Sequence, residues 1–103
     1  MQVSTTVTTQ GCHRVTVNGY SYAETWFEFL NEVELIRHEC QPLKGRSLVK
    51  YGEFNINFPN MEVPAITVNV GEAMGGAGRI NCRITYMVNG KKASKLQVMK
   101  LWA

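Results

Sequence analysis

Basic side chains and one tyrosine are the residues of this chain whose types and spacing suit a chemical role. Between Arg79 and Val88, apolar residues alternate with polar ones, and Arg83 falls on the polar side with Arg79. Strict alternation is typical of a strand with one buried face. The candidate binding residues, in this run, around it and in the stretch before Tyr51, are Lys44, Arg46, Lys50, Tyr51, Arg79, Arg83, Lys91, Lys92 and Lys95.

A cationic surface with an aromatic ring beside it suits single-stranded nucleic acid. Positive charges follow the phosphates, and flat rings stack on bases without regard to sequence. Surface lysines have a second explanation, because lysines on an edge strand also prevent aggregation between sheets. Both explanations of the basic residues stay open at the level of the sequence.

A hairpin is expected to bring these residues together. With a loop at 88–90 and Gly90 in the left-handed conformation, the return run places Lys95 opposite Arg83. One face of this hairpin would then be apolar and the other basic.

Composition indicates a single globular domain over residues 1–103. The chain is 45% hydrophobic and 18% charged, which argues against disorder. No apolar run approaches the length of a membrane span, and no secretory signal is visible at the start. With an odd count of three cysteines and nothing that indicates export, reduced thiols and a cytoplasmic location are expected.

Charge is distributed unevenly along the chain, although the net charge is only +3. Residues 1–42 carry two arginines and five glutamates, whereas residues 43–103 carry nine basic residues and three glutamates. Such a chain can face a polyanion with one side and keep the other side away from it. Alternatively, the two halves attract each other, or the basic half is an ordinary solvated surface.

Short alternating segments predict a mainly β fold. Strands are expected over 3–7, 47–58 and 63–70, and Asn18-Gly19 predicts a tight hairpin over 14–22. The segment 23–36 is ambiguous between helix and strand; we favour a short helix near residues 22–31, with Ser21 and Glu24 as a capping box, followed by a strand over 32–38. The predicted fold class is mainly β, with α+β possible: a small, partly open, OB-like antiparallel barrel with one short helix.

Catalytic and metal-binding chemistry finds little support in the sequence. Cys12, His13, His38 and Cys40 are a zinc ligand set, but their spacing matches none of the usual zinc motifs. The glycine-rich stretch 71–78 leads into a strand and not a helix, which excludes a P-loop or a dinucleotide fingerprint. We therefore expect neither an enzyme, nor a metal site, nor a cofactor.

From Leu43 onward the sequence resembles the small single-stranded-DNA-binding proteins of filamentous phages, the gene V type. The similar stretches are Leu43-Lys44-Gly45, Glu53-Phe54-Asn55-Ile56-Asn57-Phe58, Glu62-Val63-Pro64-Ala65, Gly76-Ala77-Gly78-Arg79, residues 83–90 and residues 96–101. The resemblance implies an OB-like barrel, a homodimer and cooperative coating of single-stranded DNA. It also implies that Lys44, Arg46, Arg79 and Arg83 line the binding groove, with Tyr51 as a stacking residue. Residues 1–42 have no counterpart in that pattern.

The sequence therefore predicts non-specific binding of single-stranded nucleic acid through a basic hairpin face. The alternative is a protein–protein interaction module of a phage or mobile element, an adaptor or inhibitor without catalytic activity. That module would use an exposed strand edge or the apolar surface of Trp26, Phe27, Phe29 and Leu30.

Overall fold

The fold is built on a mixed β-sheet. The structure, a computed structural model, describes residues 1–7, 12–39, 51–74 and 80–103. The strands of this part are β1 (Gln2–Val7), β2 (Cys12–Asn18), β3 (Tyr51–Asn57), β4 (Ile66–Met74), β5 (Ile80–Val88) and β6 (Lys91–Ala93). They lie in the order β1-β2-β3-β4-β5-β6, and neighbours are antiparallel except for the parallel pair β2–β3. Helix α1 (Tyr22–Glu39) lies between β2 and β3 in the chain, while α2 (Lys95–Met99) and the 3-10 turn η2 (Lys100–Trp102) follow β6.

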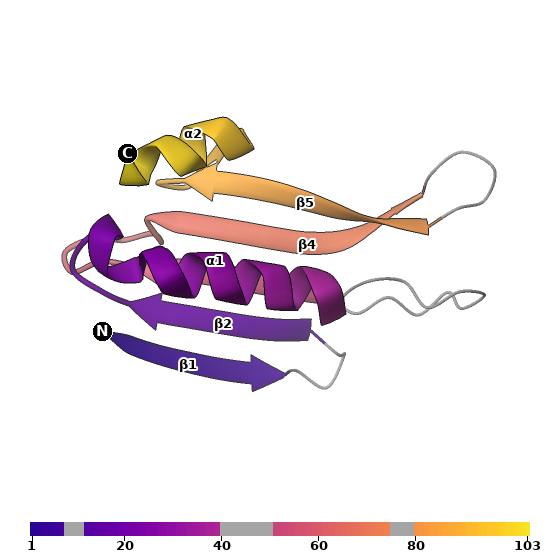
Figure 1. Cartoon of the computed structure of the whole chain (residues 1–103), viewed down its shortest axis with the longest axis horizontal. Helices are drawn as coiled ribbons and strands as arrows, with labels where there is room; N and C mark the ends of the chain where they lie inside the picture. The colour runs from indigo at the N-terminus through magenta and orange to yellow at the C-terminus, as the bar shows by residue number, and fades with distance from the viewer. Residues whose placement is uncertain (8–11, 40–50, 75–79) are drawn as a thin grey trace.

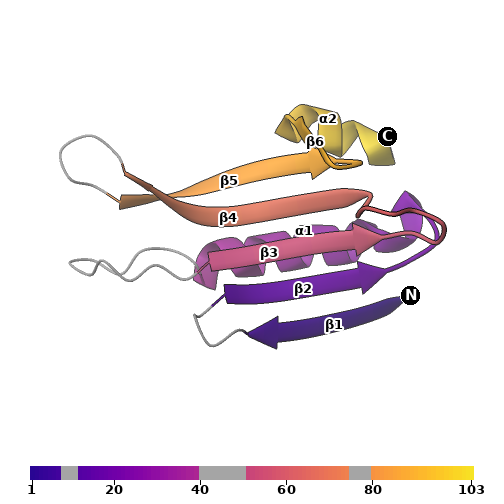
Figure 2. The same cartoon turned by 180° about the vertical axis from the view of Figure 1, so that it is seen from behind.

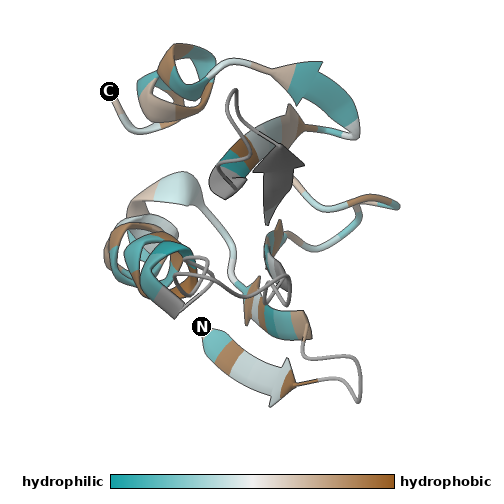
Figure 3. Cartoon of the chain, turned by 90° about the vertical axis from the view of Figure 1, so that its right-hand side faces the viewer, coloured by the Kyte–Doolittle hydropathy of each residue, from teal (hydrophilic) through white to brown (hydrophobic). Residues whose placement is uncertain are grey.

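Both helices lie on the same face of the sheet. Figure 1 shows α1 and α2 in front of the strands, and the reverse view in Figure 2 shows the strands in front of α1. The end-on view in Figure 3 agrees, with the two helices on one side. No element of the described chain covers the opposite face.

The core lies between the helices and the strands. Its buried residues are Val15, Val17, Phe29, Val33, Ile36, Phe54, Ile56, Ile66, Val68, Val70 and Val98. Phe29 of α1 meets Phe54 of β3 edge-on, with ring centroids 5.7 Å apart. Trp102 packs against Phe29 and Trp26, and its indole N–H donates to the Tyr22 carbonyl oxygen. The chain end after β6 is therefore tied to α1.

Helix α1 is longer than the sequence predicts. Phe29, Val33 and Ile36 recur at helical spacing and are all buried, so the segment stays helical to Glu39. The expected strand over 32–38 is wrong because the local alternation there is too short to outweigh the burial of one helix face. The hairpin expected over 14–22 is also wrong, since the chain leaves β2 at Asn18 and enters α1.

The mainly β class with a helix from residue 22 is confirmed, but the sheet does not close into an OB-like barrel. In the described strands, β1 and β6 each have only one neighbour, and β2 runs parallel to β3 instead of antiparallel. A parallel pair needs a crossover connection, and α1 lies within that connection. Because the helices seal one face, the apolar residues are buried without closure of the sheet.

The return strand of the last hairpin is shorter than predicted. Asn89 and Gly90 both have positive φ, at 52° and 80°, and form a two-residue turn that pairs Val88 with Lys91. Strand β6 ends at Ala93 because Ser94 caps α2: its side chain accepts from the Gln97 backbone N–H, and the Gln97 side chain accepts from the Ser94 N–H.

Replacing Phe54 by Ala should lower the free energy of unfolding by about 3–5 kcal/mol, because its side chain is 0% exposed at the centre of the core. The matched variant Phe27→Ala removes a ring that is 73% exposed on α1, so its effect should stay within about 0.5 kcal/mol. Urea unfolding followed by circular dichroism measures both values. Equal losses in the two variants would contradict the assignment of the core.

Candidate nucleic-acid interface

The uncovered side of the sheet, called the open face here, is almost entirely polar. Side chains alternate between the two faces of a strand, and the strand register therefore assigns each residue to a face. The described residues of the open face are Gln2, Ser4, Thr6, Cys12, Arg14, Thr16, Asn18, Glu53, Asn55, Asn57, Thr67, Asn69, Gly71, Arg83, Thr85, Met87 and Lys92. Their hydroxyl and amide groups can donate and accept hydrogen bonds.

Hydrogen bonds between neighbouring strands hold part of the open face in place. The Thr67 hydroxyl donates to Asn55 Oδ1 over 2.9 Å, and the exposed fraction of Asn55 is only 8%. Arg14 Nε donates to Glu53 Oε2 over 2.8 Å, which is both a hydrogen bond and an ion pair. Ordered side chains of this kind make a preformed surface for a ligand.

Arg83 borders a shallow hollow of about 260 Å³ in the open face, called the sheet hollow here. Its lining residues are Cys12, Gly52, Glu53, Asn69, Val70, Gly71, Arg83 and Thr85. Gly71 lies directly opposite Arg83 in the register and has no side chain to fill this space. Arg14 already pairs with the Glu53 carboxylate, whereas Arg83 is exposed and has no ion-pair partner among the described residues. The arginine is therefore available to an anion.

Acidic residues of α1 lie on the other side of the sheet from Arg83. Glu34 pairs with Arg37 on the same helix over 3.7 Å, and Glu24 pairs with the Met1 ammonium group over 3.1 Å. Most of the negative charge of the described chain therefore lies on α1, across the sheet from the open face. This arrangement matches the uneven charge of the sequence and does not neutralise Arg83.

The structure brings together only some of the predicted binding residues. Arg83 and Lys92 both belong to the open face, and Lys91 is exposed but pairs with Val88, on the helix side of the alternation. The expected pairing of Lys95 with Arg83 is wrong, because Lys95 begins α2 on the covered side of the sheet. Lys44, Arg46, Lys50 and Arg79 lie outside the described residues, and of Tyr51 only the backbone in β3 is described.

The uncharged residues of the open face were not among the predicted binding residues. Asn69 and Thr85 line the sheet hollow beside Arg83, and Asn55 and Thr67 lie at the centre of the face. The signal for them was present in the sequence, because they occupy the polar positions of strands whose apolar positions were recognised. The sequence prediction considered only charged and aromatic side chains and therefore omitted these uncharged residues.

The candidate zinc ligands are distributed over different places in the described chain. Cys12 lines the sheet hollow, whereas His13 has the opposite strand parity and His38 lies near the end of α1. Cys40 is outside the described residues. In the described part of the chain, no three histidine, cysteine, aspartate or glutamate side chains group as metal ligands.

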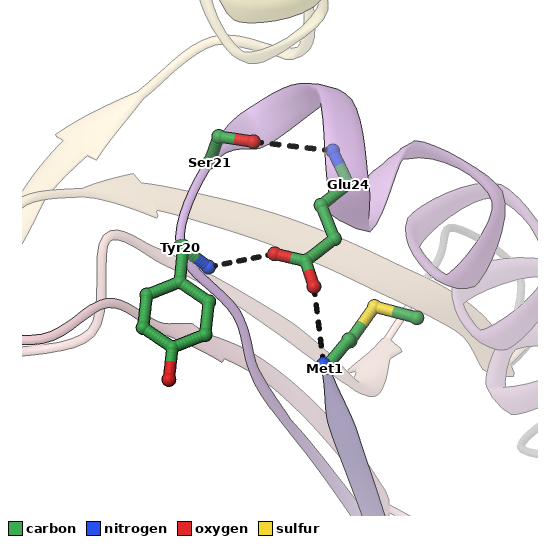
Figure 4. A network of polar contacts seen from close by, with 4 residues as sticks. All are labelled: Met1, Tyr20, Ser21 and Glu24. Atoms are coloured by element: carbon green, nitrogen blue, oxygen red, sulfur yellow. Dashed lines mark hydrogen bonds and ion pairs between the residues drawn. The ribbon is translucent and has the colours of Figure 1, made fainter.

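The turn between β2 and α1 is fixed by Glu24 (Figure 4). Its carboxylate accepts from the Tyr20 backbone N–H over 2.8 Å and pairs with the Met1 ammonium group, while its own N–H donates to the Ser21 hydroxyl. These donors, the Tyr20 N–H first and the ammonium group next, lower the pKa of Glu24 below its ordinary value of 4.5. Gly19 is required at this turn, because a Cβ there would lie 2.9 Å from the Thr25 side chain.

Glu24→Gln should remove one component of the acid sensitivity of the fold. Because the pKa of Glu24 is lower in the folded chain than its ordinary value, its ionised form stabilises the fold above that value, and this contribution is lost as pH falls through the lower, folded-state pKa. The stability difference between wild type and variant should therefore shrink from about pH 6 to about pH 3 in urea titrations. Glu34→Gln, which removes one charge from the same helix without a contact to the turn, is the control. A difference that stays constant with pH would contradict the contacts of Glu24.

Comparisons with known proteins place this chain in no family. No protein-family model matches it, and neither a curated protein nor a solved structure shows significant similarity. The resemblance to filamentous-phage DNA-binding proteins therefore stays a prediction. None of the helices in the described ranges is long and apolar enough to cross a membrane.

Proposed function

We propose that this chain binds single-stranded nucleic acid without sequence preference, and that the open face is its binding surface. The observation that carries the proposal is Arg83, an arginine without an ion-pair partner in the described chain, which borders a hollow in an uncovered polar sheet. The sequence prediction relied on the basic hairpin face and Tyr51, whereas the surface proposed here is the whole open face of the sheet.

The charges of the open face suit a polyanion. Arg83 and Lys92 are exposed cations, and the one carboxylate among its described residues, Glu53, is paired with Arg14. The glutamates of α1 lie across the sheet, where they repel a phosphate chain from the covered side. A strand of nucleic acid would therefore approach the open face in a preferred orientation.

The uncharged side chains suit the sugar–phosphate backbone. Threonine, serine and asparagine commonly contact phosphates and sugars, and these contacts position a strand without reading its sequence. Asn69 and Thr85 offer such groups beside Arg83. Tyr51 stays the predicted stacking residue, and Lys44, Arg46, Lys50 and Arg79 stay predicted phosphate contacts. Lys50 and Arg79 directly precede β3 and β5 in the sequence.

Titration of a labelled dT oligomer should show an affinity that falls steeply with salt, with log K linear in log[salt]. Arg83→Ala should weaken binding about tenfold at low salt, because it removes a charged hydrogen-bond donor. The slope should become shallower by about 0.7, the value expected for one phosphate contact of a single strand.

Lys95→Ala is the matched control, since it removes one exposed positive charge from the covered side of the sheet. Its affinity and salt slope should stay close to those of the wild type. Equal effects of the two variants would show that net charge, and not the open face, determines binding. An absence of binding at low salt would overturn the proposed function.

A protein–protein interaction module is the second candidate, and the edge strand β1 favours it. All of its residues are exposed, and its sequence contains neither a charged residue nor a proline. Natural edge strands usually carry such residues to prevent pairing, as the two lysines of the short β6 do. An added strand from a partner, including a second copy in the predicted homodimer, would pair with β1. The expectation of an apolar surface around Trp26 is wrong. Trp26, Phe29 and Leu30 pack in or against the core, and of this group only Phe27 is largely exposed.

A further inference from the structure

A second hollow lies at the end of the sheet where β2 and β3 finish. Its volume is about 350 Å³, within the range of small-molecule sites. This hollow, called the turn pocket here, is lined by Met1, Gln2, Asn18, Gly19, Tyr20, Asn57, Phe58 and Pro59. Gln2, Asn18 and Asn57 also belong to the open face, so the turn pocket is continuous with the proposed binding surface.

Tyr20 gives the turn pocket an exposed aromatic ring on a fixed backbone. Its side chain is 78% exposed, so it contributes little to the core. Its N–H is held by Glu24, and the N–H of the preceding Gly19 donates to the Asn57 carbonyl oxygen over 3.0 Å. Figure 4 shows the ring directed away from the start of α1. An exposed ring on a backbone held in this way is suited to stacking on a flat ligand.

The amides of the pocket supply hydrogen-bonding groups beside this ring. Asn57 Nδ2 donates to Asn18 Oδ1 over 3.4 Å, a long contact that leaves the other polar atoms of both amides available. An asparagine side chain presents a donor next to an acceptor, the pattern that matches the edge of a nucleobase. Ring and amides together suit a flat molecule with polar edges.

The charge of the lining residues restricts the chemical class of the ligand further. No lining residue of the turn pocket has a charged side chain, and the Met1 ammonium group is paired with Glu24. The pocket therefore suits an uncharged group, whereas the cations of the open face suit phosphates. Unstacked bases of single strands are commonly held by aromatic stacking and edge hydrogen bonds.

We propose that the turn pocket holds one unstacked nucleobase, stacked on Tyr20 and hydrogen-bonded by Asn18 and Asn57. The proposal rests on the proposed function for its ligand class, since a strand lying on the open face would deliver the base. It adds a site for a base, whereas the contacts argued above for the described residues of the open face are to phosphates and sugars.

The test compares a dT oligomer with an abasic strand of the same length. Wild type should prefer the dT strand, and Tyr20→Ala should weaken its binding about 5- to 100-fold with the salt slope unchanged. Tyr20→Phe keeps the ring and should bind as wild type does. Phe27→Ala, which removes an exposed ring from α1, is the control and should have no effect. Equal affinity for the two strands, or an unchanged affinity in Tyr20→Ala, would overturn the nucleobase site and leave the proposed function intact.

Nucleosides lack phosphate, so their binding tests the turn pocket independently of the phosphate contacts proposed for the open face. Addition of adenosine, guanosine, cytidine or thymidine to isotope-labelled protein should shift the NMR signals of Tyr20 and the Asn18 and Asn57 side-chain amides. Such shifts without binding of any oligomer would support the pocket and contradict the open-face function. No shift with any nucleoside would overturn the pocket, as would equal shifts with glucose, which would indicate a carbohydrate site.

Discussion

The packing of α1 against one face of the sheet is the interaction on which the rest of the structure depends. Phe29, Val33 and Ile36 contact the apolar side of the central strands, and Trp102 joins the end of the chain to the same layer. Burial of these side chains is the main favourable term in the folding free energy. Because α1 and α2 occupy the same side, the opposite face of the sheet has no cover in the described chain.

Alternation along each strand then determines the chemistry of the open face. When every second residue of a strand is buried in the core, the residues between them face water. Here these residues are largely threonine, asparagine and serine. Arg83 and Lys92 add positive charge to this face, while α1 keeps its glutamates on the other side. The function we propose thus follows from which side of the sheet the helices cover, and not from any single motif.

Sequence reasoning recovered the parts of the fold that local patterns determine. The strands expected over 47–58 and 63–70 follow from period-two alternation, and β3 and β4 lie there with Phe54, Ile56, Ile66, Val68 and Val70 buried. The order of the strands and the parallel pair β2–β3 depend on contacts between distant segments, which alternation does not encode. The predicted barrel was wrong for that reason.

Two shorter signals were misinterpreted or missed; the first affected the predicted fold and the second the predicted site. Alternation between Glu32 and Leu35 suggested a strand, although the apolar spacing across the whole segment was helical. The capping pair Ser94 and Gln97 starts α2 and separates Lys95 from Arg83, yet a five-residue helix has too few residues for periodicity to reveal it. The polar residues of the open face could be identified from the alternation along each strand, once the side covered by the helices was known.

An NMR titration of the labelled chain with a dT oligomer tests the central claim most directly, because backbone signals report on both faces of the sheet at once. The account predicts shifts along the open face, at Asn55, Asn69, Arg83 and Thr85, and little change along the outer side of α1. Shifts confined to α1 and α2, with the open-face signals unchanged, would contradict it.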